Sequence, residues 1–115
     1  MSGLSEYHIP EITVQELKQL LDDNKRPFIL DVREKPEYDI ANLGGHLIPF
    51  GELVDHMKDL EKYCDDQLIV VHCRSGGRSA QAVRFLHAAG FRNAKNLRGG
   101  TVAWSREIDP SLPTY

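Results

Sequence analysis

Hydrophobic residues recur with helical spacing in three segments of the chain. Thr13 and Glu16 have the spacing of a capping box, and one helical face follows with Val14, Leu17, Leu20 and Leu21. A second segment carries its apolar positions at Leu53, Val54, Met57 and Leu60. A third runs from Arg78 to Ala89, with an expected inner face of Ser79, Ala82, Val83, Leu86 and Ala89, and with Gly90 placed to end it. Each segment predicts an amphipathic helix.

Short apolar runs between these segments predict strands. The runs at 28–32 and 68–72 are nearly continuous, which is typical of strands covered on both faces of a parallel sheet, and 46–49 and 94–97 are weaker. We also expect a helical turn at 36–41 and a last helix at 102–107, with Pro110 and Pro113 ending ordered structure. The alternation of strands and helices predicts an α/β fold: a mainly parallel central sheet flanked by helices on both faces. Ligands of such sheets bind beyond the carboxyl ends of the strands.

The composition is that of one ordinary globular domain. The chain has 115 residues, 41% of them apolar and 27% charged, so we expect a single domain over 1–115 with a core at about 11–108 and flexible termini. No apolar run approaches the roughly 18 residues of a membrane helix, and the N-terminus lacks the layout of a secretory signal. Two cysteines make no disulfide framework, so we expect a cytoplasmic protein without a membrane partner.

Charge is distributed unevenly along the chain. The net charge of −3 argues against nucleic acid as a partner. Residues 1–72 contain 7 Lys and Arg against 15 Asp and Glu, whereas residues 73–115 contain 7 against 2. This bias has two interpretations, an anion-attracting surface in the second half or ordinary solvated helix faces.

The segment from Cys73 to Ser79 is the best candidate for chemistry, because it directly follows the clearest strand and precedes a helix. Its glycines allow a curled loop whose N–H groups converge on an anion, and the helix N-terminus adds positive character. A cysteine in this setting should be partly exposed, with a lowered pKa. We therefore predict a catalytic Cys73 and a substrate-binding loop made of Arg74, Ser75, Gly76, Gly77, Arg78 and Ser79.

The loop length distinguishes two kinds of chemistry. Cys73 and Arg78 are separated by four residues, whereas cysteine phosphatases place five between these positions. A shorter loop fits a smaller guest, such as one sulfur atom carried on the cysteine. The geometric argument favours sulfur transfer and leaves a phosphatase or arsenate reductase as the enzymatic alternative.

Other polar residues receive structural interpretations. Asp31 and Arg33 are expected to form an ion pair, and His72 should face away from Cys73 because adjacent strand residues point to opposite faces. Cys64 lies in an acidic turn that should keep it inert. The histidines and cysteines have no metal-ligand spacing, so we expect no metal and no other cofactor.

The chain resembles the rhodanese family over nearly its whole length. The segments that carry the resemblance are 12–17, 29–33 with Glu37 and Tyr38, 45–49, 73–79, and 97–100 with Ala103 and Trp104. It implies a single rhodanese-like domain and a sulfurtransferase that carries a persulfide on Cys73. The loop from Arg74 to Arg78 would bind the outer sulfur and an anionic donor such as thiosulfate. A protein persulfide is the alternative donor.

A narrower resemblance concerns residues 42–49 and 108–113, which are similar to the rhodanese domain of E1-like adenylyltransferases. Those enzymes serve molybdopterin and thiamin sulfur transfer, which implies a sulfur-carrier protein as acceptor. The sequence has no adenylyltransferase domain, and Phe50-Gly51-Glu52 departs from the pattern of many single rhodaneses. Whether the chain is free-standing or part of a longer enzyme stays open. The non-enzymatic alternative is a rhodanese-fold binding module, against which the intact Cys73 counts.

Overall fold

The sheet has five strands, all parallel, in the order β1-β5-β4-β2-β3. The computed structural model describes residues 8–63 and 67–115. The strands are β1 (Glu11–Ile12), β2 (Phe28–Asp31), β3 (His46–Leu47), β4 (Ile69–His72) and β5 (Ala94–Leu97). Every residue of β4 is buried, as the continuous apolar run predicts for a central strand. β1 was not predicted, because two residues are too short to show a periodicity.

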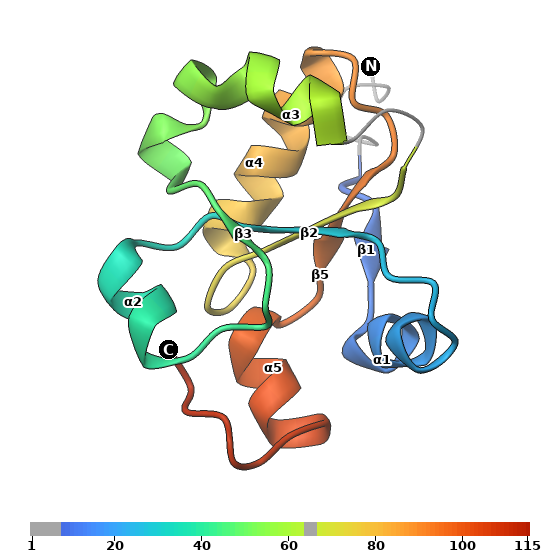
Figure 1. The fold of residues 1–115 in the computed structure, drawn as a ribbon, viewed down its shortest axis with the longest axis vertical. Coiled ribbons are helices and arrows are strands. Elements are labelled where there is room, and N and C mark those ends of the chain that lie inside the picture. Colours follow the sequence, from blue (N-terminus) through green and yellow to red (C-terminus); the bar gives the residue numbers. More distant parts are fainter. Residues whose placement is uncertain (1–7, 64–66) are drawn as a thin grey trace.

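Helices cover both faces of the sheet (Figure 1), as predicted. α1 (Val14–Asp22) and α5 (Gly100–Glu107) enclose a core with Ile29, Val70 and Trp104. α3 (Met57–Tyr63) and α4 (Gly77–Ala88) enclose the other, with Leu30 and Val71. Consecutive residues of β2 and β4 thus point into opposite cores. Cys73, two residues after Val71, therefore lies on the α3/α4 side. α2 (Lys35–Ile40) follows the carboxyl end of β2.

The first predicted helix is confirmed in detail. Thr13 is its N-cap, and the Thr13 hydroxyl accepts from the Glu16 N–H at 3.1 Å while the Glu16 carboxylate accepts from the Thr13 N–H at 2.8 Å. Val14 and Leu17 are buried under the sheet. This reciprocal pair fixes where the chain leaves β1 and enters α1.

The predicted helix over 53–60 is wrong in its first half. Two short 3₁₀ turns, η2 (Phe50–Glu52) and η3 (Val54–His56), precede α3. Their tighter winding keeps Leu53 and Leu60 buried but turns Val54 outward, where it is 67% exposed. A regular helical period therefore does not describe this segment.

The end of α4 also corrects the prediction, because Ala89 is exposed. Gly90 has a φ of +100° and reverses the chain, with the Gly90 N–H bonded to the His87 carbonyl at 3.0 Å and the Phe91 N–H to the Leu86 carbonyl at 2.9 Å. This closure packs Phe91, rather than Ala89, against the α3/α4 core.

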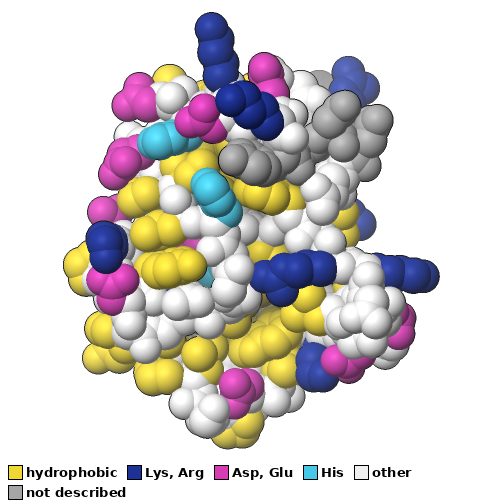
Figure 2. Space-filling view, viewed as in Figure 1, with side chains coloured by type: hydrophobic (Ala, Val, Ile, Leu, Met, Phe, Trp, Pro, Cys, Tyr) yellow, Lys and Arg dark blue, Asp and Glu magenta, His cyan; other side chains and the backbone are white. Residues whose placement is uncertain are grey.

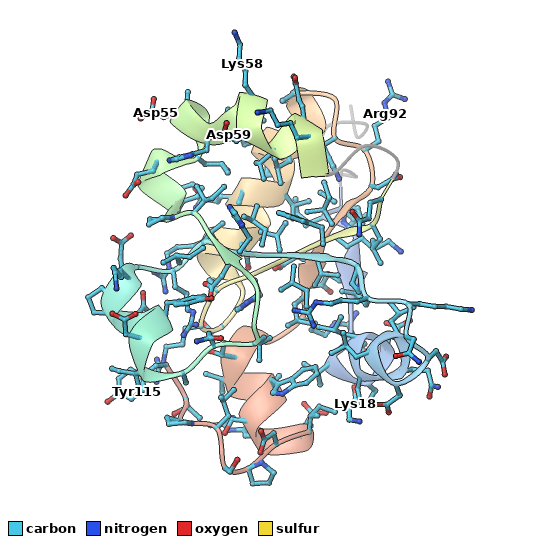
Figure 3. All side chains as sticks on the ribbon, viewed as in Figure 1. Lys18, Asp55, Lys58, Asp59, Arg92 and Tyr115 are labelled. Carbon is cyan, nitrogen blue, oxygen red and sulfur yellow. The ribbon has the colours of Figure 1, made fainter. Side chains whose placement is uncertain are left out.

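No described helix or strand follows Glu107, but the chain beyond it returns to the domain. The Ser105 hydroxyl donates to the Leu112 carbonyl at 2.5 Å, and the Thr101 hydroxyl donates to the Tyr115 backbone oxygen at 2.6 Å. Arg33 Nη1 donates both to the Tyr115 backbone oxygen and to the Glu37 carbonyl of α2, so Tyr115 lies near α2 (Figure 3). Pro110 and Pro113 thus end regular structure without ending contact with the core.

No helix among residues 8–63 and 67–115 is long and apolar enough to cross a membrane. On the face drawn in Figure 2, Lys and Arg side chains are spread over the surface, several of them beside acidic ones, and do not form a continuous basic patch.

Candidate active site

Cys73 lies immediately after β4, at the carboxyl edge of the sheet where the fold predicts a ligand. Three residues later Gly76, with a φ of +115°, turns the chain into α4. Contrary to the expected partial exposure, the Cys73 side chain is only 2% exposed and packs against the α3/α4 core. The alternation of β4 explains this, because Cys73 points to the same face as Val71.

The Cys73 sulfur accepts two hydrogen bonds. The Gly76 N–H donates to Sγ at 3.1 Å, and the Ser79 hydroxyl, one turn into α4, lies 3.3 Å from Sγ. Burial raises the pKa of the Cys73 thiol, but hydrogen bonds from Ser79, Gly76 and Ser75 outweigh it, so the pKa is lower than that of an ordinary thiol. The arrangement therefore favours a thiolate.

The loop is held from behind by the N-terminus of α5. The Thr101 N–H donates to the Cys73 carbonyl at 3.1 Å, and the Val102 N–H donates to the Arg74 carbonyl at 3.0 Å. Gly100 makes this approach possible: it has a φ of +58°, and a Cβ there would lie 2.4 Å from the Cys73 carbonyl oxygen. The two loop carbonyls, which would repel an anion, are thus engaged with α5 rather than with the sulfur side.

The two loop arginines differ in their partners. Arg78 forms a bidentate ion pair with Glu37 of α2, with Nη1–Oε1 and Nη2–Oε2 distances of 3.0 and 3.1 Å. The Arg78 guanidinium, partly opposed by burial, lowers the pKa of Glu37 to about 2. Arg74 is exposed, and its Nε donates to the Thr114 carbonyl at 2.9 Å. The charge of Arg78 is therefore balanced before any substrate arrives, which the sequence did not indicate.

Ser79 and Asn96 complete the surroundings of the sulfur. Ser79 is fully buried, and its Oγ lies 2.6 Å from Oδ1 of Asn96 on β5. Sequence reasoning missed Asn96, because nothing in the short run 94–97 distinguishes it; only the pairing of β5 with β4 brings it near the loop. We call Cys73, Gly76, Ser79 and Asn96 the sulfur cradle.

The other two predicted loop residues take less specific places. Ser75 is exposed, and its backbone N–H helps to lower the pKa of the Cys73 thiol. Gly77 is the first residue of α4, and a Cβ there would meet no atom within 4 Å. Both residues are exposed, so this part of the loop is open to solvent.

A second polar group lies on the opposite face of the same edge. Asp31 and Arg33 form a fully buried ion pair with an Nη2–Oδ2 distance of 2.8 Å, and His72 Nε2 lies 3.6 Å from Asp31 Oδ2. Burial lowers the pKa of His72 and keeps the ring neutral. We call these three residues the ion-pair cluster. The predicted structural pair and the predicted orientation of His72, away from the thiol, are both confirmed.

A metal site has no support in the part of the chain that the structure describes, where no three His, Cys, Asp or Glu side chains come together. Cys64, predicted to be inert, lies outside the described residues.

Residues 13–107 match the sequence pattern of the rhodanese-like domain. The chain belongs to this family. It is 37% identical over 105 residues to a protein of Mycobacterium tuberculosis named as the probable adenylyltransferase/sulfurtransferase MoeZ, covering 90% of this chain and 26% of that protein. It is 38% identical over 109 residues to the adenylyltransferase and sulfurtransferase MOCS3-2 of Zea mays, covering 90% of this chain and 23% of that one. The rhodanese-like chain thus spans about a quarter of these relatives, whose names include sulfur transfer.

Solved structures agree with this assignment of the fold. A rhodanese-like domain protein from Staphylococcus aureus superposes with a TM-score of 0.77 at 31% identity, covering 93% of this chain and 99% of that one. A thiosulfate sulfurtransferase from Pseudomonas aeruginosa gives 0.77 at 32% identity, covering 89% of this chain and 20% of that one. The expected single α/β domain of rhodanese type is confirmed.

Proposed function

We propose that this domain is a sulfurtransferase that carries sulfane sulfur as a persulfide on Cys73. The observation that supports this most directly is the sulfur cradle, in which a buried thiol with a lowered pKa accepts hydrogen bonds at the end of a parallel strand. The loop with four residues between Cys73 and Arg78 is the second support. Membership of a family with sulfurtransferase relatives makes sulfur transfer the natural reaction class.

The proposed reaction has two displacement steps. The Cys73 thiolate attacks the outer sulfur of thiosulfate, the S–S bond of the donor breaks, and sulfite leaves with the bonding electron pair. A nucleophilic acceptor then attacks the outer sulfur of the persulfide, and Cys73 leaves as the thiolate. The Gly76 N–H and the Ser79 hydroxyl stabilise the charge on Sγ when it attacks and when it leaves.

The loop residues suggest the sulfur donor, and the relatives suggest the sulfur acceptor. Arg74, Ser75, Gly77 and Arg78 line the loop and would bind a small anionic donor, although Glu37 already balances Arg78. A protein persulfide is the alternative donor. A sulfur-carrier protein is the proposed acceptor, by likeness to the adenylyltransferase and sulfurtransferase relatives. The small number of cysteines supports a reducing compartment such as the cytoplasm.

Intact mass measured after incubation with thiosulfate tests the proposal. We expect the mass of one added sulfur atom, lost again on treatment with cyanide or a dithiol. Cys73→Ser should abolish the gain, and the matched control Cys64→Ser should keep it. Sulfur that still loads onto Cys73→Ser would overturn the assignment, and robust hydrolysis of an aryl phosphate would favour the phosphatase alternative instead.

A further inference from the structure

Asn96 is the residue behind the sulfur to which the proposed reaction gives no role. It lies on β5 opposite Val71 of β4 and is 4% exposed. Both ends of its amide are engaged: Nδ2 donates to the Gly76 carbonyl at 3.2 Å, and Oδ1 accepts from the Ser79 hydroxyl at 2.6 Å. Gly76 and Ser79 also donate to Cys73 Sγ, so Asn96 contacts one sulfur donor directly, the Ser79 hydroxyl, and holds the other residue through its carbonyl.

The orientation of the amide follows from its two partners. The Gly76 carbonyl can only accept, so the Asn96 group that faces it must be the NH₂. Oδ1 then faces Ser79, and the hydroxyl must be the donor of that contact. The reverse orientation would bring Oδ1 against the Gly76 carbonyl oxygen.

The Ser79 hydroxyl has one proton and two acceptors within reach. Asn96 Oδ1 is at 2.6 Å and Cys73 Sγ at 3.3 Å. Ser79 is fully buried, which limits the competition for the proton to its immediate neighbours. The proton therefore cannot serve Asn96 and a thiolate at the same time.

We propose that Asn96 is a positioning residue that acts on Cys73 through Ser79, taking the hydroxyl proton whenever Sγ is uncharged and yielding it when Sγ becomes a thiolate. In the thiol form, the Cys73 S–H points to Ser79 Oγ, and the Ser79 O–H points to Asn96. On ionisation the thiol proton leaves to solvent, and the hydroxyl rotates about its C–O bond. The O–H···Oδ1 bond breaks and an O–H···S⁻ bond forms, with no other atom changing place.

The same alternation would accompany the two steps of sulfur transfer, and this part rests on the proposed function. Sγ is uncharged as the inner sulfur of a persulfide, so the Ser79 proton returns to Asn96. When an acceptor attacks the outer sulfur, Sγ leaves as a thiolate, and the Ser79 hydroxyl donates its hydrogen bond to Sγ again. Asn96 therefore stabilises the persulfide relative to the thiolate and slows discharge.

The charges of the other groups around the sulfur do not change in this proposal. Arg74 and Arg78 come from the loop, Glu37 of α2 pairs with Arg78, and His72 lies on the opposite face of β4 with Asp31. None of them contacts Asn96 or Ser79 through an observed hydrogen bond, so a change confined to the Ser79 proton leaves their charges in place.

The test is a double-mutant cycle of Asn96→Ala and Ser79→Ala in the Cys64→Ser background. The thiolate fraction is followed through its ultraviolet absorbance as a function of pH. We expect Ser79→Ala to reduce the thiolate-to-thiol ratio at pH 7 by about threefold when Asn96 is present and by about tenfold or more in Asn96→Ala. The difference arises because Ser79 without Asn96 gives its proton wholly to the thiolate.

The cycle separates this role from a purely structural one. Loss of the Nδ2 contact to Gly76 affects the loop equally with or without the Ser79 hydroxyl, so it cancels in the cycle. An equal effect of Ser79→Ala in both backgrounds would overturn the proposal. Asn96→Val, which suits a strand and fills more of the site, replaces Asn96→Ala if the latter does not fold, with the same expectation.

A second readout uses the persulfide. Cyanide should discharge persulfide from Asn96→Ala about threefold to tenfold faster than from the parent, and from Ser79→Ala more slowly. Discharge from Asn96→Ala at the parent rate would contradict the proposal. If thiosulfate loads no sulfur at all, the proposed function fails, and the thiolate measurement still decides the role of Asn96.

Discussion

His72 and Cys73 are neighbours in sequence, yet they belong to two buried polar groups, the ion-pair cluster and the sulfur cradle, whose polar atoms are stabilised in different ways. The ion-pair cluster holds full charges that are fixed: Asp31 accepts from the Arg33 N–H, Nε and Nη2 at 2.8–3.2 Å. The sulfur cradle holds one ionisable atom among neutral donors. Charges that fully satisfy one another favour one rigid state, whereas dipoles and a rotating hydroxyl accommodate a sulfur whose charge changes.

The surroundings of each group reinforce this difference. Arg33 also donates to the Ala41 carbonyl at 2.6 Å and to the Tyr115 backbone oxygen, so its guanidinium ties β2 to the segment after α2 and to the end of the described chain. The cradle's contacts with the sulfur and with Asn96 connect β4, β5 and the start of α4, and the Cys73 carbonyl also accepts from Thr101 of α5. We therefore expect damage to the ion-pair cluster to appear as lost stability and damage to the cradle as altered sulfur chemistry.

The largest effect should come from Asp31→Ala. It leaves the buried Arg33 guanidinium without its counter-ion, and removing one member of a buried pair costs about 3–5 kcal/mol of unfolding free energy. Urea denaturation measures this, with Asp39→Ala as the control, because Asp39 forms only an exposed pair with Lys35 and should change stability by less than about 1 kcal/mol. Similar, small losses from both variants would show that the ion-pair cluster does not carry the stability assigned to it.

Gly100→Ala should damage the cradle from behind. A left-handed conformation costs a residue with a Cβ about 1–2 kcal/mol, and the overlap with the Cys73 carbonyl adds about 1–3 kcal/mol. The unfolding free energy should fall, and sulfur loading should fall with it. The matched control is Gly77→Ala, where a Cβ meets nothing within 4 Å, and its stability should stay within about 1 kcal/mol of the parent. Normal loading by a folded Gly100→Ala would mean that α5 does not shape the loop.

Arg78→Ala should affect catalysis more than stability. Removing a charge-assisted contact loses roughly 1.5–3 kcal/mol of transition-state stabilisation, or about ten- to a hundredfold in kcat/KM for thiosulfate. The loss includes a contribution from Glu37, whose carboxylate would face the loop without its partner. Steady-state kinetics checks this against Arg84→Ala, an exposed position farther along α4. Equal and small effects of the two substitutions would show that the backbone and hydroxyl donors bind the anion without Arg78.

The smallest effect concerns the pH dependence of stability through His72. Its pKa is lowered in the folded protein, so below about pH 6.5 the unfolded chain binds the additional proton. Stability should therefore fall as pH decreases from 6.5, by about 1 kcal/mol over one pH unit. Thermal unfolding should show this slope in the parent and not in His72→Leu. Glu37 leaves this window unaffected, because its stabilising charge is lost only below about pH 4.5, as its pKa of about 2 is approached.

Local patterns were sufficient to predict most of the fold. The capping box at Thr13, the continuous run of β4 and Gly90 after α4 each act through neighbours in sequence, and each appears in the structure. The segment at 53–60 failed because 3₁₀ turns and an α-helix place Leu53 and Leu60 equally well in the core and differ only at Val54. A pattern of apolar residues does not separate these two windings.

The candidate site could be predicted only as far as it is continuous in sequence. Cys73 and its loop were visible because strand, glycines and helix follow one another directly. Glu37 and Asn96 were not assigned their contacts, since these depend on α2 folding over the edge and on β5 lying beside β4. The burial of Cys73 was missed for a related reason: the polar residues that flank it in sequence are not those that surround it in space.

The bonds from α5 to the loop carbonyls also turn two amide protons into reporters. Thr101 and Val102 donate to Cys73 and Arg74, so these N–H groups exchange with deuterium only when α5 and the loop separate. A molecule in which they exchange early has an open loop even while its sheet is intact. Exchange rates at these two positions would thus show whether the site is assembled in the resting protein, without any sulfur donor being added.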